Sequence, residues 1–308
     1  MPIDEAGDVA AATAAAEAAI AAGLDGVVGP YSSGVGLAVL PLFLDAGIVP
    51  IHLTTVNETS GLGFTLQPKA YQIAPVAAEA LGTWLGATNV ALLVDDTQAY
   101  TTTIAGDVAR ELDARGIAST TSAIVPGRED YADVAAAVMT GGYDAVYLVA
   151  YTPEGGRIAA ALHAAGSTVA CLADYRAYDA AYVTFAGIPA APACPVVGVP
   201  APDDFLNAGS FFAALDTAFR QAPGSWTPYT YDSVMFLAEG ITRARGTDAT
   251  AVTDALDRTR SWLGWTGAIT IDPETGDRDP ATVVVARSDD AGTLHTDLDW
   301  VVAVDAEL

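Results

Sequence analysis

The sequence is poor in basic residues. Lys and Arg together number 13 against 38 Asp and Glu, which gives a formal net charge of −25, and Lys69 is the only lysine. A surface of this charge repels phosphate backbones, so nucleic acid is not an expected partner. No apolar run approaches the roughly 20 residues that a helix needs to cross a bilayer, so we expect no membrane span in this chain.

The residues that most often carry catalysis are also scarce. The three histidines, His52, His163 and His295, belong to no recognisable triad or metal-ligand spacing. The Ser32-Ser33 pair lacks the glycine spacing of a hydrolase elbow, and Gly61-Leu62-Gly63 lacks the third glycine of a dinucleotide loop. We therefore expect no enzyme and no cofactor, and interpret His52 as a structural histidine.

Only two cysteines are present, Cys171 and Cys194, and no C-x-x-C motif accompanies them. Each belongs to an apolar run that we interpret as a strand. If the two strands are neighbours, the cysteines can form a disulfide, and otherwise they are two buried thiols. The sequence leaves both alternatives open.

The order of apolar patterns indicates an α/β protein. The chain has 308 residues, of which 52% are hydrophobic and 17% charged, enough for two lobes with their own cores. Short apolar runs alternate with helical patterns, which is typical of parallel sheets with helices on both faces. Strands are predicted at 26–28, 49–52, 90–94, 118–125, 145–150 and 168–173. Helices are predicted at 8–22, 34–46, 76–86, 102–115, 131–139, 153–165, 209–221, 229–245 and 249–260. The C-terminal part is predicted to turn β-like, at 267–271, 281–286 and 299–304.

The segment Gly29-Pro30-Tyr31-Ser32-Ser33-Gly34 joins a predicted strand to a predicted helix. Free N–H groups at a helix N-terminus, together with the helix dipole, favour a carboxylate there. Ser32 and Ser33 are therefore candidate carboxylate ligands. The alternative is that they are ordinary N-caps.

Other candidate residues follow later strands, at the sheet edge where open α/β sheets bind ligands. Hydroxyls follow the early strands, and aromatic rings and carboxylates follow the later ones. This division suits a zwitterion, whose carboxylate needs donors and whose ammonium needs an acid and ring faces. The candidates are Thr54, Thr55, Asn57, Asp95, Asp96, Tyr100, Tyr151, Asp174 and Tyr175.

These segments together resemble the type I periplasmic binding proteins of branched-chain amino-acid and amide ABC transporters, the Leu/Ile/Val-binding group. The resemblance runs from Asp4 to about His295. It is carried by Gly29–Gly34, Asp45-Ala46-Gly47-Ile48-Val49-Pro50-Ile51, Val94-Asp95-Asp96-Thr97-Gln98-Ala99-Tyr100, Tyr143-Asp144-Ala145-Val146-Tyr147, Tyr151-Thr152-Pro153-Glu154-Gly155-Gly156, Tyr229-Thr230-Tyr231-Asp232-Ser233-Val234 and Gly267-Ala268-Ile269-Thr270-Ile271-Asp272 with Thr275-Gly276-Asp277.

The resemblance implies two doubly wound lobes joined by three crossovers, with a ligand held in the interlobe cleft. It assigns the ligand carboxylate to Ser33, further contacts to positions 54 to 56, and the ammonium to Asp174. It assigns ring contacts to Tyr100, Tyr151 and Trp226. The implied lobes are 1–75 with 201–287, and 76–200 with 288–308. The implied ligand residues are Ser32, Ser33, Thr54, Thr55, Val56, Tyr100, Tyr151, Asp174 and Trp226.

The sequence departs from the family pattern at three places. Val56 stands where a threonine hydroxyl is usual, although Thr55 supplies one after a shift of one residue. Gly7 and Ser32 stand where the family has a disulfide. The chain begins where the family's second strand ends, so we expect the natural protein to be longer at its N-terminus, with the first strand and a signal peptide.

The function expected from these features is that of a solute-binding protein. It would capture a small amino acid or amide outside the cytoplasm and deliver it to the membrane permease of an ABC transporter, and the full-length form would be membrane-anchored. The alternative is a cytoplasmic amide or amino-acid sensor that regulates a partner protein.

Overall fold

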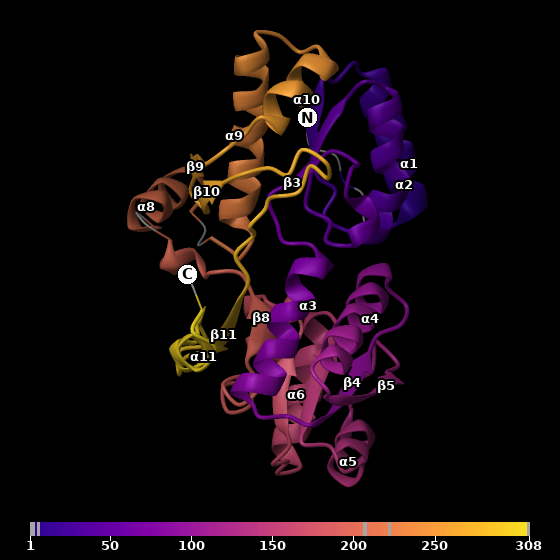
Figure 1. The fold of residues 1–308 in the computed structure, drawn as a ribbon, viewed down its shortest axis with the longest axis vertical. Helices are drawn as coiled ribbons and strands as arrows, with labels where there is room; N and C mark the ends of the chain where they lie inside the picture. Colours follow the sequence, from indigo (N-terminus) through magenta and orange to yellow (C-terminus); the bar gives the residue numbers. More distant parts are fainter. Residues whose placement is uncertain (1–3, 5–6, 206–207, 221–222, 307–308) are drawn as a thin grey trace. The chain divides into compact units, whose positions relative to one another are not determined.

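The chain forms two compact units in the computed structural model, which describes residues 4, 7–205, 208–220 and 223–306 (Figure 1). Unit 1 comprises residues 1–69 and 226–281, and unit 2 comprises residues 70–225 and 282–308. The chain thus passes between the units three times. These boundaries differ from the implied lobes, because segments 70–75, 201–225 and 282–287 belong to unit 2 and not to the first lobe.

Unit 1 is built on a three-stranded parallel sheet with the order β1-β2-β3. Its strands are β1 (Gly26–Val28), β2 (Val49–His52) and β3 (Phe64–Thr65). Two helices connect and flank them, α1 (Val9–Ala21) and α2 (Ser33–Asp45), and the short η1 (Asn57–Thr59) follows β2. The predicted ranges 8–22, 34–46, 26–28 and 49–52 match these elements closely, because their apolar spacing was regular.

The second segment of unit 1 covers the other face of this sheet. It contains α9 (Thr227–Ala244), α10 (Ala249–Asp257) and the antiparallel pair β9 (Trp262–Gly264) and β10 (Gly267–Ile269). Phe236 and Leu256 pack there on Ile51 and Phe64. On the opposite face, α1 and α2 form a separate core with Ile48. Each face of the sheet is therefore sealed by two helices.

Unit 2 contains a seven-stranded sheet with the order β12-β11-β8-β7-β6-β4-β5. All pairs from β8 to β5 are parallel, and β11 is antiparallel to both β8 and β12. Its strands are β4 (Asn89–Val94), β5 (Ala118–Ala123), β6 (Ala145–Val149), β7 (Ala170–Ala173), β8 (Val196–Gly198), β11 (Val284–Ser288) and β12 (Leu294–Thr296). Its helices are α3 (Ala70–Glu79), the π-helix η2 (Ala80–Trp84), α4 (Ala99–Ala114), α5 (Ala132–Thr140), α6 (Thr152–Ala164), η3 (Tyr175–Ala177), α7 (Ala180–Ala186), η4 (Pro202–Asp204), α8 (Ala208–Phe219) and α11 (Leu298–Val304).

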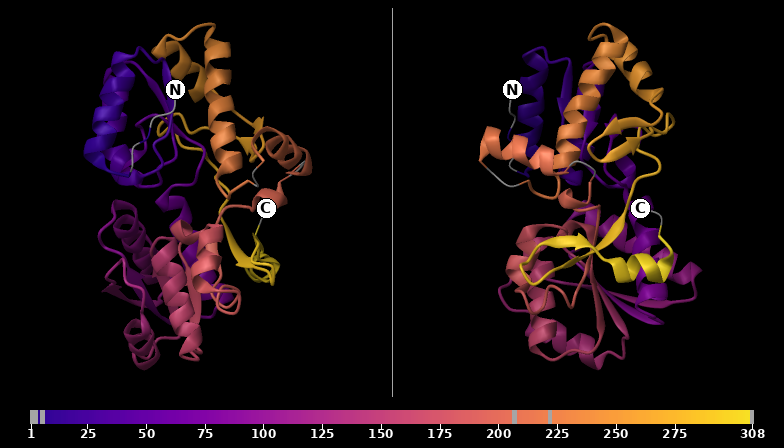
Figure 2. Two further views of the ribbon diagram at one scale, coloured as in Figure 1. Left: turned by 180° about the vertical axis from the view of Figure 1, so that it is seen from behind. Right: turned by 90° about the vertical axis from the view of Figure 1, so that its left-hand side faces the viewer.

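Helices lie on both faces of this sheet (Figure 2). α3 packs on α4, whereas α6 packs on α5 and α7. The chain runs outward from β4 to β5 and then returns past β4 to β6, so the strand order reverses between β4 and β6. A reversal of this kind opens a crevice at the carboxyl ends of the strands, where α/β sheets bind ligands. The α/β fold class with mostly parallel sheets is confirmed.

One prediction about the C-terminal half is wrong. Residues 299–304, predicted as a strand, form helix α11, because the Asp297 carboxylate accepts hydrogen bonds from the N–H groups of Asp299 and Trp300 and caps a helix. The terminal strand is instead β12, Leu294–Thr296, paired with β11. Helix α8 ends at Phe219, and residue 221 of the predicted helix 209–221 lies outside the described residues.

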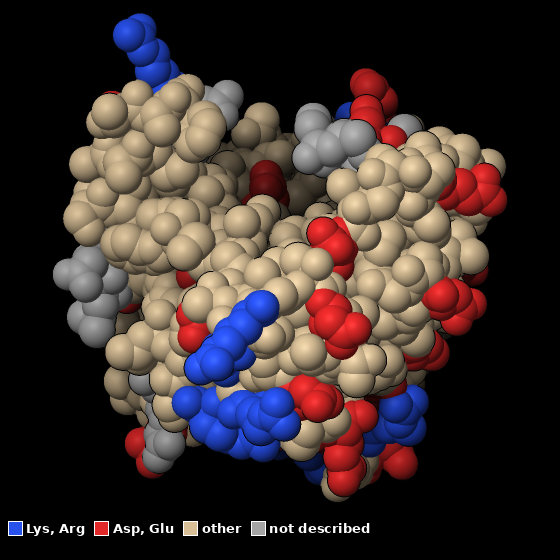
Figure 3. Space-filling model, turned by 90° about the horizontal axis from the view of Figure 1, so that it is seen from above, with Lys and Arg blue, Asp and Glu red and all other residues tan. Residues whose placement is uncertain are grey.

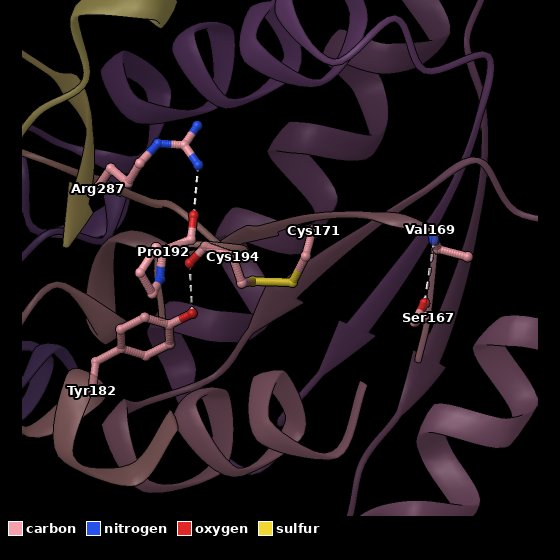
Figure 4. The surroundings of a disulfide bond; sticks show 7 residues. All are labelled: Ser167, Val169, Cys171, Tyr182, Pro192, Cys194 and Arg287. Carbon is pink, nitrogen blue, oxygen red and sulfur yellow. Dashed lines mark hydrogen bonds between the residues drawn. A yellow bond between two sulfur atoms is a disulfide. The ribbon is translucent and has the colours of Figure 1, made fainter. Parts of the chain in front are cut away.

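Cys171 and Cys194 form a disulfide in unit 2 (Figure 4). Cys171 lies on β7, and Cys194 lies just before β8, the neighbouring parallel strand. The Tyr182 hydroxyl donates to the Cys194 carbonyl oxygen at 2.7 Å, and Arg287 donates to the Pro192 carbonyl oxygen. Of the two alternatives that the sequence left open, the structure thus contains the disulfide, and hydrogen bonds hold the segment that carries Cys194.

Most of the face in Figure 3 is uncharged, and most of its basic side chains gather near the lower edge among acidic ones. Several acidic residues instead serve as local caps: Asp8, Asp179 and Asp248 each accept a hydrogen bond from a backbone N–H at the start of a helix. These three aspartates therefore have a structural use at helix ends.

Candidate functional site

Ser32 and Ser33 lie at the N-terminus of α2, directly after β1, as the sequence predicted. Ser32 is the N-cap, and its hydroxyl accepts a long hydrogen bond of 3.4 Å from the Val35 N–H. Ser33 is buried, and its Oγ accepts from the Thr55 N–H at 3.3 Å. This contact uses a lone pair and leaves the Ser33 proton available to donate. Ser32 is thus a cap, whereas Ser33 is suited to bind an anion.

Gly36 allows α2 to approach the segment after β2. A Cβ atom added at Gly36 would lie only 2.5 Å from the Thr54 methyl carbon. Only glycine fits such a close approach without displacing its neighbour. The glycine therefore sets the distance between the start of α2 and residues 54 to 56.

Residues Thr54, Thr55 and Val56 are fully buried in unit 1. The Thr54 hydroxyl lies 2.9 Å from His52 Nδ1 and 2.7 Å from the Thr59 hydroxyl. Because the Thr59 hydroxyl donates its one proton to the Val56 carbonyl oxygen, the Thr54 hydroxyl donates to Thr59 and accepts from His52 Nδ1. The Thr54 hydroxyl is therefore engaged within unit 1, and a ligand contact from this residue would have to use its backbone.

His52 is a structural histidine in this network. It is fully buried, and its pKa lies well below the usual value because burial and the nearby Lys69 charge both disfavour the protonated ring. In the part of the chain that the structure describes, no cluster of three or more His, Cys, Asp or Glu is placed to hold a metal ion. Among those same residues, no helix is long and apolar enough to cross a membrane.

Trp226 lies just before α9 in unit 1 and contacts the residue that precedes the serine pair. Its ring centroid is 6.2 Å from that of Tyr31 and 6.3 Å from that of Tyr229. Rings at this spacing attract one another and hold their relative orientation. The structure therefore brings Trp226 close to the α2 N-terminus. Tyr31 is an aromatic neighbour that is not among the ligand residues implied by the family resemblance.

Asp174 lies directly after β7 in unit 2 and is fully buried. Its carboxylate accepts from the Tyr147 hydroxyl at 2.7 Å, the Arg176 N–H at 3.2 Å and the Tyr100 hydroxyl at 3.3 Å. Burial raises the pKa of Asp174, and these donors act in the opposite direction by stabilising the charged form. The result is a buried, oriented acid at the carboxyl end of β7.

Tyr100 and Tyr147 form this cluster from two further elements. Tyr100 comes from the first turn of α4, and Tyr147 from the centre of β6. The pKa of each hydroxyl lies well above its usual value, first because of burial and then because of the nearby Asp174 charge. Both hydroxyls therefore stay protonated and donate. Tyr147 was missed as a site residue, although a tyrosine in a buried strand needs a partner for its hydroxyl and so signals one.

The remaining residues after the strands of unit 2 differ in their role. Tyr151 is half-buried at the start of α6, directly after β6. The Asp95 carboxylate accepts from the N–H and hydroxyl of Thr97, which makes it a local turn residue. Arg176 is buried, and its guanidinium lies 5.0 Å from the centroid of the Tyr100 ring. Arg176 is a second neighbour of Asp174 that the sequence reading did not single out.

Comparison with known proteins identifies the family of the chain. The sequence profile of the periplasmic binding protein family matches residues 1–293. The chain belongs to the periplasmic binding protein family. The predicted family is thereby confirmed.

A curated relative, the Leu/Ile/Val-binding protein BraC3 of Rhizobium johnstonii, is 31% identical over 174 residues. The match covers 54% of this chain and 47% of BraC3, so the chain spans about half the length of that relative. The leucine-binding protein LivK of Thermotoga maritima has a similar fold, with a TM-score of 0.87, 22% identity, and 96% of this chain and 85% of LivK covered. LivJ of Streptococcus pneumoniae, solved with isoleucine, gives a TM-score of 0.82 and 18% identity, with 94% of this chain and 84% of LivJ covered.

Proposed function

We propose that this protein is the solute-binding component of an ABC transporter and captures a small zwitterion, an amino acid or an amide. In this proposal the ligand lies in the cleft between the two lobes, and each unit holds one of its ends. The permease of the transporter receives the ligand, and the protein works outside the cytoplasm, anchored to the membrane in its full-length form. The protein carries out no chemical step on the ligand.

The observation that carries the proposal is the geometry of Ser33. Its hydroxyl is buried at the N-terminus of a 13-residue helix and accepts from the Thr55 N–H, so its own proton points to no carbonyl or carboxylate among its contacts in the described residues. A buried hydroxyl normally has an acceptor. A ligand carboxylate supplies one, and the helix dipole favours the negative charge.

The second support is the Asp174 cluster of unit 2. Hydroxyl and backbone N–H donors orient its carboxylate. An ammonium group close to this buried acid would also stabilise its charged form. Unit 1 thus offers donors suited to a carboxylate, and unit 2 offers an acid suited to an ammonium group.

A thermal-shift screen tests the proposal. The purified protein is heated with each of the common amino acids, with simple aliphatic amides and with matched carboxylic acids that lack the amino group. A ligand that binds only the folded state raises the melting temperature in proportion to the logarithm of its concentration. We expect a shift with at least one aliphatic amino acid or amide, and calorimetry gives its Kd. If no amino acid or amide shifts the melting temperature at millimolar concentration, the proposal is wrong.

A further inference from the structure

Lys69, the only lysine of the chain, is fully buried in unit 1. Burying an ammonium group costs several kcal/mol unless its protons find acceptors. Lys69 lies at the end of the first segment of unit 1, immediately before the chain passes into unit 2. No prediction from the sequence gave this residue a role.

The Lys69 ammonium donates into the segment that contains the proposed carboxylate-binding residues. Its Nζ donates to the Val56 carbonyl oxygen at 3.2 Å and to the Thr59 hydroxyl at 2.7 Å. Thr59 in turn donates to the same Val56 carbonyl at 2.9 Å and contacts the Thr54 hydroxyl. Lys69 thus holds the segment directly at Val56 and Thr59, and it reaches Thr54 through the Thr59 hydroxyl.

The same ammonium pairs with Asp277 at 3.7 Å, and both side chains are fully buried. The Ser60 hydroxyl donates to the other Asp277 oxygen at 2.6 Å. Asp277 lies four residues before the second segment of unit 1 ends at residue 281. The ion pair therefore joins residues from the two ends of unit 1 at which the chain passes into unit 2.

Lys69 can affect ligand binding through the Thr55 N–H. This group donates to Ser33 Oγ, so the position of residue 55 decides whether the Ser33 proton points outward to a ligand. Lys69 holds residue 56 directly and residue 54 through Thr59. Without the ammonium, the Val56 carbonyl loses a donor and the segment is free to shift.

We propose that Lys69 is a positioning residue for the carboxylate-binding serine, which it orders by clamping the segment Thr54–Thr59 against Asp277. The inference rests on the proposed function, because it assigns Lys69 to the same site. It also predicts that the clamp acts on affinity, beyond its effect on stability.

The test compares binding of L-leucine, or of another amino acid that passes the thermal-shift screen, to three forms of the protein. The first is the wild type. The second is Lys69→Met/Asp277→Asn, which removes both buried charges together and so avoids an unpaired carboxylate. The third is a matched control, Arg243→Met. Arg243 also donates to a carbonyl oxygen and to a threonine hydroxyl, those of Ala255 and Thr259, but these contacts lie away from the proposed site, where α9 packs on α10.

We expect the double variant to bind at least tenfold more weakly by calorimetry below its unfolding temperature, and the Arg243→Met control to bind as the wild type does. A pH series adds a readout that loss of stability alone would not move. The charged groups near Lys69 are Asp277, Glu58 and His52, and burial lowers the pKa of Lys69 to about 8. The affinity of the wild type divided by that of the double variant should therefore fall as the pH rises through this value, because the wild type then loses the charge on Lys69.

The outcomes separate the two proposals. If the wild type binds the amino acid and the double variant binds it equally well, or if the ratio does not change with pH, Lys69 is not a positioning residue, and the proposed function stands. A loss as large in Arg243→Met would also overturn the inference, because it would show a general effect of destabilising unit 1. If the wild type binds no amino acid or amide, both proposals fail together.

Discussion

Removing the buried charge of Lys69 should change how the stability of the protein depends on pH. Burial lowers the pKa of Lys69 from 10.5 to about 8 in the folded protein, partly offset by Asp277. In the unfolded chain the same group titrates near its ordinary value of about 10.4. Between these two values the unfolded chain binds a proton that the folded protein has released.

The sign and the size of the effect follow from proton linkage. Where the unfolded state binds more protons, the free energy of unfolding rises with pH. The gain from Lys69 begins near pH 8 and is complete above the unfolded pKa. For the cited shift, the free energy of unfolding should increase by about 2 kcal/mol between about pH 7 and about pH 9.5. At lower pH both states are protonated, and the buried charge is a constant cost.

Urea denaturation of the ligand-free protein across this range measures the effect, with Lys69→Met/Asp277→Asn as the reference. Other buried groups titrate outside this pH range. His52 has a lowered pKa in the folded protein, so it reduces the free energy of unfolding only below its unfolded pKa of about 6.5. The buried tyrosines have raised pKa values, so they reduce the free energy of unfolding only above about pH 10. We expect the stability difference, wild type minus variant, to rise by about 2 kcal/mol with pH. Parallel curves for the two proteins would refute the reasoning, since they would show that Lys69 keeps its proton on folding.

The remaining predictions concern single contacts. Ser33→Ala should weaken amino-acid binding by about 1–3 kcal/mol, measured by calorimetry, and lower stability by only about 1 kcal/mol; equal affinity would make Ser33 a mere helix residue. Asp174→Asn should weaken binding of L-leucine but not of isocaproate, which lacks the amino group, and an equal loss for both would make Asp174 structural. Replacing both Cys171 and Cys194 with serine, across a sequence separation of 23, should lower the free energy of unfolding by about 3 kcal/mol in urea, and an unchanged midpoint would contradict this. Gly36→Ala should destabilise the protein, although alanine favours helices by about 1 kcal/mol, because its Cβ would lie 2.5 Å from the Thr54 methyl; a higher urea midpoint would count against that contact.

The sequence was informative wherever one residue pattern decides the structure. Strands such as β4 and β6 are short continuous apolar runs between helical patterns, and their length and their alternation with those patterns identify them. Ser33 could be placed for the same reason, since a helix that follows a strand begins near the carboxyl end of that strand. The run Trp300-Val301-Val302-Ala303-Val304 is also short and apolar, but a cap formed by the side chain of Asp297 made it helix α11.

The parts of the site that were missed depend on contacts across long distances in the sequence. Lys69 pairs with Asp277, 208 residues away along the chain. Tyr147 and Asp174 meet only because β6 and β7 are neighbours in the sheet. No local pattern encodes either contact, because each depends on which strands pair and in which register. A buried lysine and a buried strand tyrosine are nevertheless signals, since each requires a partner.

The charge balance explains why a lone buried lysine matters for a carboxylate ligand. A protein with a net charge of −25 repels an anion, yet surface charges more than about 8 Å away are largely screened at physiological salt. Buried charges and helix dipoles are screened much less. Near Ser33 the local field is set by the N-terminus of α2 and by the Lys69 cluster, in which the ammonium and the Asp277 carboxylate oppose each other. The ammonium donates toward the Thr54–Thr59 segment, whereas Asp277 also accepts from Ser60. Unit 1 therefore presents donors at this edge of its sheet despite the acidic surface. Because Asp277 raises the pKa of Lys69 against the effect of burial, replacing Asp277 alone should favour the neutral amine and weaken the attraction for an anion.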